Sequence, residues 1–153
     1  MRTHEWLIRF GIVVNVYRQF HDSNNGSQVN PGEEFQLHLE IARAAKRKTD
    51  ADTVILDVGD VLSITGWFVI TSGTSNRQVR AIAAGIEEDV FLAGGLKPIR
   101  VEGLDDGTWV LVDYGDVIVH IFDEETRAFY DLERLWRDVP SALWSARPDE
   151  NVD

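Results

Sequence analysis

The chain has 153 residues, 44% of them hydrophobic, which is enough for one domain with a buried core and too few for two. It contains no cysteine, which excludes disulfides, thiolate catalysis and cysteine-based zinc or iron–sulfur sites. The 26 acidic and 15 basic residues give a formal net charge of −11, which disfavours general nucleic-acid binding and favours a basic partner.

The first part of the chain differs in character from the rest. We expect residues 1–34 to form an N-terminal extension and linker, because residues 21–34 (HDSNNGSQVNPGEE) are polar and rich in turn formers. The apolar stretch near the N-terminus is broken by Arg9 and Asn15, so we expect neither a signal peptide nor a membrane span. The expected location is the cytoplasm.

The first elements of the main domain are a helix and two strands. Apolar residues at Phe35, Leu39, Ala42 and Ala45 have helical spacing, which predicts a helix that begins near Glu34. The β-branched run 53–58 predicts a strand, and residues 64–71 predict a second extended segment after a break at Gly59 and Asp60.

A long helix is predicted next. Ser75 and Gln78 have the spacing of a capping box, in which each side chain satisfies a backbone amide at the start of a helix. Gly94 and Gly95 end the helix. Between Ser75 and Gly94 lies a helical apolar stripe made of Val79, Ile82, Ala83, Ile86 and Val90.

The remaining pattern predicts strands at 99–102, 108–112 and 117–122, the last two joined by a hairpin around Tyr114 and Gly115. These two strands are apolar on both faces, so both faces of the sheet should be covered. A final helix is predicted from Phe129, Leu132, Leu135 and Trp136, with Phe129, Leu132 and Trp136 facing the core.

The expected fold class is α/β. The order of elements predicts a single layered domain over residues 35–139, with a mixed five-stranded sheet and helices on both faces. Residues 140–153 are expected to form a mobile acidic tail.

Most familiar catalytic patterns are absent. The sequence has no phosphate-binding glycine loop and no H-x-x-x-H pair, and we predict no catalytic, cofactor-binding or metal-binding residues. One enzymatic alternative stays open, because a strand, Gly73 and a helix that begins at Ser75 resemble the start of a nucleotidyltransferase site. The carboxylates that such a site needs for magnesium are poorly placed, since Asp57 and Asp60 lie three apart around a glycine.

Two stretches resemble the ribosomal silencing factor, or Iojap, family. They are WVLVDYGDVIVHIF at 109–122 and FYDLERLW at 129–136, with Arg127 between them. The resemblance covers about residues 35–139. It implies a nucleotidyltransferase-like fold without the catalytic carboxylates, and binding to large-subunit ribosomal protein fourteen with little direct RNA contact. Bound there, such a protein blocks the joining of the small subunit and represses translation under nutrient limitation.

The resemblance leaves other possibilities and carries two departures. Organellar relatives imply a role in large-subunit assembly as an alternative, and a homodimer is possible. The family usually has Asp and Tyr or Cys where this chain has Gly66 and Trp67, so its contact with the ribosome could differ there.

A docking surface is expected on the hairpin and the last helix. His120 is expected near the edge of the core, positioned by an acid such as Asp113, and Tyr114 is expected to be an exposed anchor. Arg127 is expected either to pair with an acid among residues 123–125 or to reach the partner. The predicted partner-binding residues are Asp113, Tyr114, Asp116, His120, Arg127, Tyr130 and Glu133.

Overall fold

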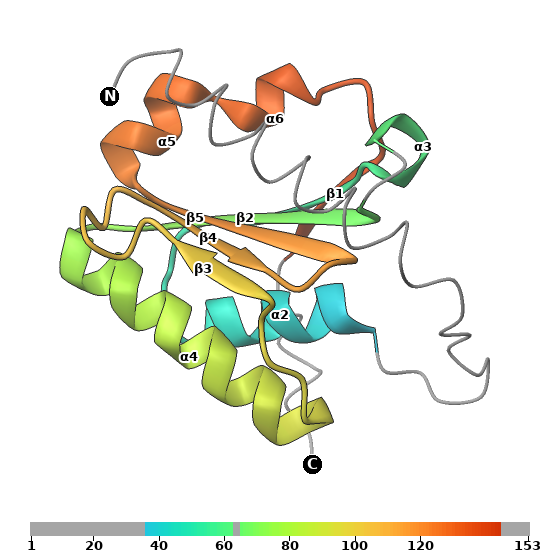
Figure 1. Ribbon diagram of the computed structural model, residues 1–153. Coiled ribbons are helices and arrows are strands. Elements are labelled where there is room, and N and C mark those ends of the chain that lie inside the picture. The colour runs from blue at the N-terminus through green and yellow to red at the C-terminus, as the bar shows by residue number, and fades with distance from the viewer. Residues whose placement is uncertain (1–35, 63–64, 145–153) are drawn as a thin grey trace.

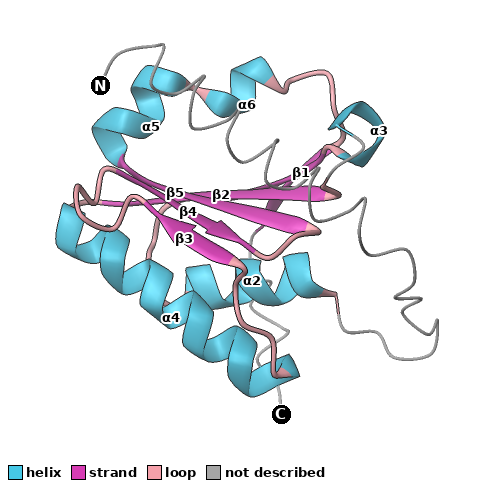
Figure 2. Cartoon of the chain, in the orientation of Figure 1, coloured by secondary structure: helices cyan, strands magenta, loops and turns pink. Residues whose placement is uncertain are grey.

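The computed structural model describes residues 36–62 and 65–144. The expected N-terminal extension and the end of the expected tail lie outside these residues. The described chain forms a sheet between two helical layers, as Figures 1 and 2 show. Its elements are α2 (Leu37–Lys46), β1 (Thr53–Asp57), α3 (Gly59–Leu62), β2 (Trp67–Gly73), α4 (Asn76–Gly94), β3 (Arg100–Glu102), β4 (Trp109–Asp113), β5 (Val117–Asp123), α5 (Glu124–Tyr130), α6 (Leu132–Leu135) and β6 (Ser141–Trp144).

The sheet has six strands in the order β3-β4-β5-β2-β1-β6. The central pair, β2 and β5, is parallel, and the other neighbouring pairs are antiparallel. The predicted α/β class, the mixed sheet and the five expected strands are therefore confirmed, with one strand added. α2 and α4 cover one face, and α5 and α6 cover the other (Figure 1).

The added strand, β6, lies in the segment that we expected to be a tail. It pairs antiparallel with β1, from Thr53 opposite Trp144 to Leu56 opposite Ser141. The amide of Asp57 also donates to the carbonyl of Pro140 at 2.9 Å. A strand of four residues has too little length to show an alternating pattern, so pairing with β1 and not local sequence defines it.

Each face of the sheet has its own apolar core. The first core joins the sheet to α2 and α4 and contains the whole predicted stripe of α4 (Val79, Ile82, Ala83, Ile86, Val90). The second core joins the other face to α5 and α6 and includes Phe68, Trp109, Phe122 and Leu132. Neighbouring residues of β4 alternate between the two cores, which confirms that the sheet is covered on both sides.

The predicted cap of α4 is confirmed only in part. The amide of Gln78 donates to Ser75 Oγ at 3.1 Å, as expected for the N-terminal residue of a capping box. The side chain of Gln78, however, accepts a hydrogen bond from the amide of Thr74 at 2.6 Å, one residue earlier than a capping box requires. At the other end Gly95 has φ 70°, a left-handed conformation that ends the helix.

The single final helix that we predicted is wrong, because the chain breaks at Asp131. This residue has φ 46° and is the only described non-glycine residue with a positive φ. The break resets the helical phase between α5 and α6. As a result Phe129, expected in the core, is 66% exposed, while Leu132 is 2% exposed, as expected.

None of the described helices is long and apolar enough to cross a lipid bilayer.

The break at Asp131 generates a first prediction. Replacing Asp131 with valine should lower the free energy of unfolding by about 1–2 kcal/mol, because a β-branched side chain disfavours the left-handed conformation. The matched change Asp138→Val, at another exposed aspartate of the same segment, should stay within about 0.5 kcal/mol. Urea unfolding of the two variants measures the difference, and equal stabilities would contradict it.

Candidate functional site

The β4–β5 hairpin depends on Asp113. The carboxylate of this residue accepts a hydrogen bond from the amide of Gly115 at 2.8 Å, and Gly115 has φ 89°. The amide of Tyr114 donates to the carbonyl of Val117 at 2.9 Å and closes the turn. Asp113 is 3% exposed, and burial raises the pKa of its carboxyl while the Gly115 bond partly offsets that effect. Its position is that of a turn-forming residue.

Asp116 is exposed at the tip of the hairpin. Its carbonyl accepts hydrogen bonds from the amides of Gly66 and Trp67 and from Thr65 Oγ1, at 2.9, 3.0 and 2.9 Å. A Cβ at Gly66 would lie 2.7 Å from Asp116 Oδ1, so the glycine leaves room for this carboxylate. The first departure from the family pattern therefore lies directly beside the hairpin tip.

The second departure, Trp67, faces α2. Its ring stacks flat on His38, with centroids 3.9 Å apart and planes 3° apart. Burial lowers the pKa of His38, although Asp116 and Asp57 act in the opposite direction. The stack joins the start of β2 to the first turn of α2, and His38 covers one face of the Trp67 ring.

Tyr114 is half-buried and packs against the first core, so the expectation of an exposed anchor is wrong. Its hydroxyl is buried and has no hydrogen-bond partner among the described residues. Burial, and next the charge of Glu87 on α4, raise the pKa of this hydroxyl.

His120 is inside the second core and not at its edge, which corrects a second expectation. It is 2% exposed, and its Nδ1 accepts a hydrogen bond from Trp109 Nε1 at 3.2 Å. The ring of Phe68 lies edge-on at 4.7 Å. Burial lowers the pKa of His120 to about 3, so the imidazole is neutral. The partner of His120 is thus a tryptophan and not Asp113.

Arg127 and Glu133 bind each other. Arg127 Nη2 donates to Glu133 Oε1 at 2.7 Å, and Nη1 donates to the carbonyl of Asp52 at 2.7 Å and to Ser72 Oγ at 2.9 Å. The expected pairing of Arg127 with an acid at 123–125 is wrong, because Asp123 caps α5 through the amide of Thr126 instead. Arg127 joins the α5–α6 layer to the ends of β1 and β2.

Tyr130 packs against the second core, with its ring 5.0 Å from that of Trp109. The expected outward orientation was therefore wrong, and the residue beside it, Phe129, is the one exposed. The break at Asp131 explains why Tyr130 faces the core and Phe129 faces the solvent. Of the seven predicted contact residues, the structure leaves only Asp116 fully on the surface.

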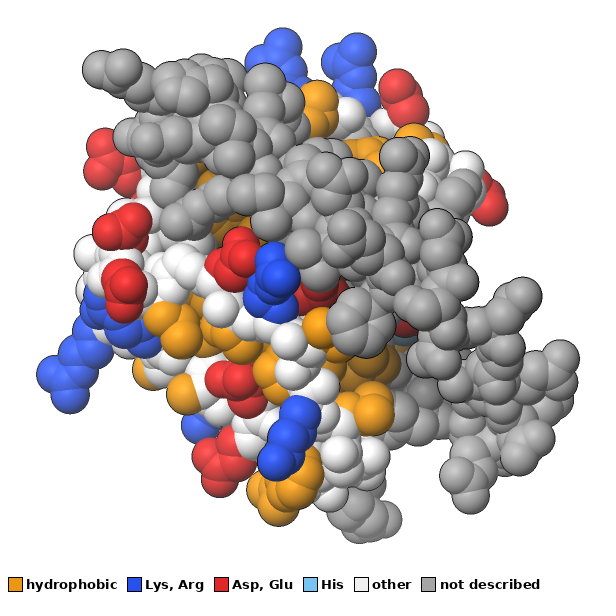
Figure 3. All heavy atoms as spheres, in the orientation of Figure 1, with side chains coloured by type: hydrophobic (Ala, Val, Ile, Leu, Met, Phe, Trp, Pro, Cys, Tyr) orange, Lys and Arg blue, Asp and Glu red, His pale blue; other side chains and the backbone are white. Residues whose placement is uncertain are grey.

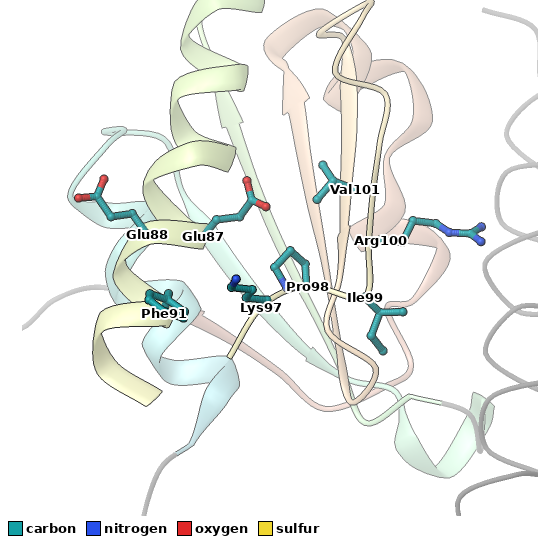
Figure 4. Close-up of a pocket in the computed structure, with 8 residues that line it drawn as sticks. All are labelled: Glu87, Glu88, Phe91, Lys97, Pro98, Ile99, Arg100 and Val101. Carbon is teal, nitrogen blue, oxygen red and sulfur yellow. The ribbon is translucent and has the colours of Figure 1, made fainter. Parts of the chain in front are cut away.

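A groove between α4 and β3 was not predicted. Its volume is about 580 Å³, and Figure 4 shows Glu87 of α4 and Val101 of β3 pointing toward each other across it. Phe91 and Ile99 at its lower end are 48% and 47% exposed. Figure 3 shows hydrophobic side chains gathered among charged ones on this face. Only a weak indication of this groove is present in the sequence. Phe91 is a large apolar residue that lies outside the buried stripe of α4.

Two amides near the start of α4 already have side-chain partners. The amide of Thr74 is bonded by the side chain of Gln78, and that of Gln78 by Ser75. Asp57 accepts a long hydrogen bond, 3.4 Å, from the amide of Gly59. Within residues 36–62 and 65–144 no group of acids and histidines could hold a metal ion. The described surface offers charges and apolar side chains for contact.

The buried His120 generates a pH prediction. The folded state keeps this imidazole neutral down to about pH 3, whereas an unfolded histidine titrates near 6.5. Because the unfolded state binds more protons between these values, this group lowers the free energy of unfolding as pH falls, by at most about 1.4 kcal/mol per pH unit.

The variant His120→Phe should lose this part of the acid sensitivity. It should also be less stable than the parent at neutral pH by about 1–3 kcal/mol, because Trp109 Nε1 loses its acceptor. Urea unfolding at several pH values measures both effects. The difference in free energy of unfolding between the parent and the variant should shrink as pH falls below about 6.5. A difference that is independent of pH would contradict the assignment.

The Arg127 network generates a stability prediction. Arg127→Ala should lower the free energy of unfolding by about 1–3 kcal/mol, because the Arg127 side chain is only 15% exposed and Glu133 and the carbonyl of Asp52 lose their shared donor. Arg134→Ala, at an exposed residue of α6, should change it by no more than about 0.5 kcal/mol. Thermal and urea unfolding compare the two, and a larger loss for Arg134→Ala would refute the role of the network.

Comparisons with known proteins agree with the fold and with the resemblance. A family model described as "Ribosomal silencing factor during starvation" matches residues 32–152. The ribosomal silencing factor RsfS of Bacillus subtilis is 41% identical over 105 residues, which are 68% of this chain and 88% of that protein. A crystal structure of a Chromobacterium violaceum protein has a TM-score of 0.63 and 29% identity, and covers 76% of this chain and 96% of its own.

A more distant relative comes from mouse. The protein named "Mitochondrial assembly of ribosomal large subunit protein 1" is 30% identical over 110 residues, which are 69% of this chain and 46% of that protein. The family model spans every strand of the described sheet. This chain belongs to the ribosomal silencing factor family.

Proposed function

We propose that this protein binds the large ribosomal subunit through ribosomal protein fourteen and prevents the small subunit from joining. Translation would then be repressed in the cytoplasm when nutrients are limiting. The observation that carries the proposal is the family match over residues 32–152, together with the name of the Bacillus subtilis relative.

The charge of the chain supports a protein partner over an RNA partner. At a net charge of −11 most of the surface would be repelled by the phosphates of ribosomal RNA. A basic ribosomal protein would be attracted instead, and the association rate would fall as salt is added. Direct contact with RNA is therefore a minor part of the proposal.

The proposed mechanism is steric and includes no bond-making step. Two amides near the start of α4, those of Thr74 and Gln78, already have side-chain hydrogen-bond partners. A nucleotidyltransferase-like enzyme is the alternative from a different class. Isothermal titration with nucleoside triphosphates and magnesium tests it, and measurable heat would favour the enzyme.

A role in large-subunit assembly is the second alternative, and the name of the mouse relative favours it. Both roles would use the same contact with the large subunit. Ribosome profiles of a deletion strain separate them: precursors of the large subunit during growth would indicate assembly, and an effect confined to starvation would indicate silencing. We also propose that a homodimer can form, which light scattering at several concentrations would test.

We place the contact at the hairpin tip, where Asp116 is the exposed member of the predicted set. Asp113, Tyr114 and His120 would then act indirectly by shaping the hairpin, and Arg127, Tyr130 and Glu133 by holding the α5–α6 layer. This division follows from the burial and internal bonds of those residues.

Binding to the ribosome provides the test of the proposal. The protein should co-sediment with free large subunits and not with intact ribosomes, and should bind purified protein fourteen at micromolar concentration. Asp116→Lys should weaken both interactions about tenfold through charge reversal at the tip, while Asp50→Lys, at an exposed loop between α2 and β1, should not. Absence of binding by the unchanged protein would reject the proposal. Equal binding by both variants would reject only the role of Asp116.

A further inference from the structure

The groove between α4 and β3 combines apolar walls with charged residues of both signs, Glu87 and Glu88 on α4 and Lys97 and Arg100 on the side of β3. Val101 and Pro98 line the side of β3, and Phe91 lines the side of α4 (Figure 4). The carboxylate of Glu87 points into the space between them. With a volume of about 580 Å³ the groove is large enough for one or two side chains and too open to be a closed ligand cavity.

One wall of the groove is the edge of the sheet. β3 pairs with β4 on one side and is the outermost strand on the other. Its outer backbone groups therefore have no strand partner among the described residues. An unpaired edge of this kind is a template for an added strand from another chain.

Glu87 and Glu88 have no ion pair or hydrogen bond among the described residues, whereas the nearby acids Asp89 and Glu102 do. Asp89 is paired with Arg47 at 3.1 Å, and Glu102 with Arg100 at 3.0 Å. The nearby cation, Lys97, has its Nζ 5.5 Å from the centre of the Phe91 ring. Burial raises the pKa of Glu87, which indicates that its charge is poorly solvated. A cation from outside would offset that cost.

We propose that this groove binds an extended basic segment of a partner protein, which adds a strand to β3 and directs an arginine or lysine toward Glu87. The apolar part of that side chain would lie against Phe91 and Val101, and a neighbouring apolar residue would contact Ile99. The proposal rests on the proposed function, because the large ribosomal subunit would supply the segment.

The groove is continuous with the hairpin at which we place the ribosomal contact. The amide of Ile99 donates to the carbonyl of Asp113 at 2.7 Å, so the mouth of the groove and the base of the turn are joined. The charge of Glu87 also acts on the hydroxyl of Tyr114. One partner could therefore contact Asp116 and the groove together.

A second copy of this chain is a less suitable occupant. Each copy carries a net charge of −11, and a symmetric contact through the same groove would bring two Glu87 side chains toward each other. A basic segment is attracted by the chain as a whole, and Arg100 in the groove is already paired with Glu102.

The test compares three full-length variants with the parent in co-sedimentation with purified large ribosomal subunits. Glu87→Lys should bind at least about tenfold more weakly, because it places a like charge against the basic segment. Ile99→Asp, a change at an exposed position, is a second variant that should also weaken binding. Asp138→Lys makes the same charge change beyond α6 and should bind like the parent. Circular dichroism and thermal unfolding verify that each variant is folded.

The outcomes separate the two proposals. Parent-like binding by folded Glu87→Lys and Ile99→Asp would overturn the groove as a docking site and leave the proposed function standing. No binding by the parent would reject the proposed function and this inference with it. If Glu87→Lys changes the self-association of the free protein instead, as light scattering would show, the groove is an interface between copies and the inference is wrong.

Discussion

The fold depends on covering both faces of one sheet. Every residue of β4 is buried, and so is every residue of β5 except the last, Asp123. Such strands cannot leave a face in water, because each large apolar side chain that is buried contributes about 1.5–3 kcal/mol relative to exposure. The helices on each side are therefore a requirement of the sheet. The short α5 and α6, which would be unstable alone, are held because the second core needs Leu132 and Tyr130.

The same constraint explains which parts of the fold and of the site could be predicted. The stripe of α4 and the apolar runs of β4 and β5 are long, periodic signals, and the structure follows them. The break at Asp131 could not be predicted from the sequence, because aspartate is tolerated in both helical and left-handed conformations and no neighbouring residue favours one of them. The partner of His120 was missed for a similar reason. Alternation gives the face of the strand, but only the sheet register places Leu111 opposite His120 and brings Trp109 within reach.

The polar residues of the family-like stretches have mainly internal partners. Asp113 bonds the turn, His120 bonds Trp109, and Arg127 bonds Glu133. Polar residues that recur in a pattern can thus define a surface without lying on it, by fixing the shape of a hairpin or the position of a helical layer. We propose that a partner contacts the tip at Asp116 and the groove beside Glu87, and the acidic character of the chain favours a basic protein in that role.

The pairing of β6 with β1 has a consequence for synthesis of the protein. β1 is the first described strand of the chain and β6 is the last, and they lie side by side at one edge of the sheet. While the nascent chain is still growing, the outer side of β1 lacks its described partner, β6, until residues 141–144 emerge from the exit tunnel. During that interval the unfinished molecule carries an open strand edge able to join another chain, which makes prompt completion of translation a condition for avoiding aggregation.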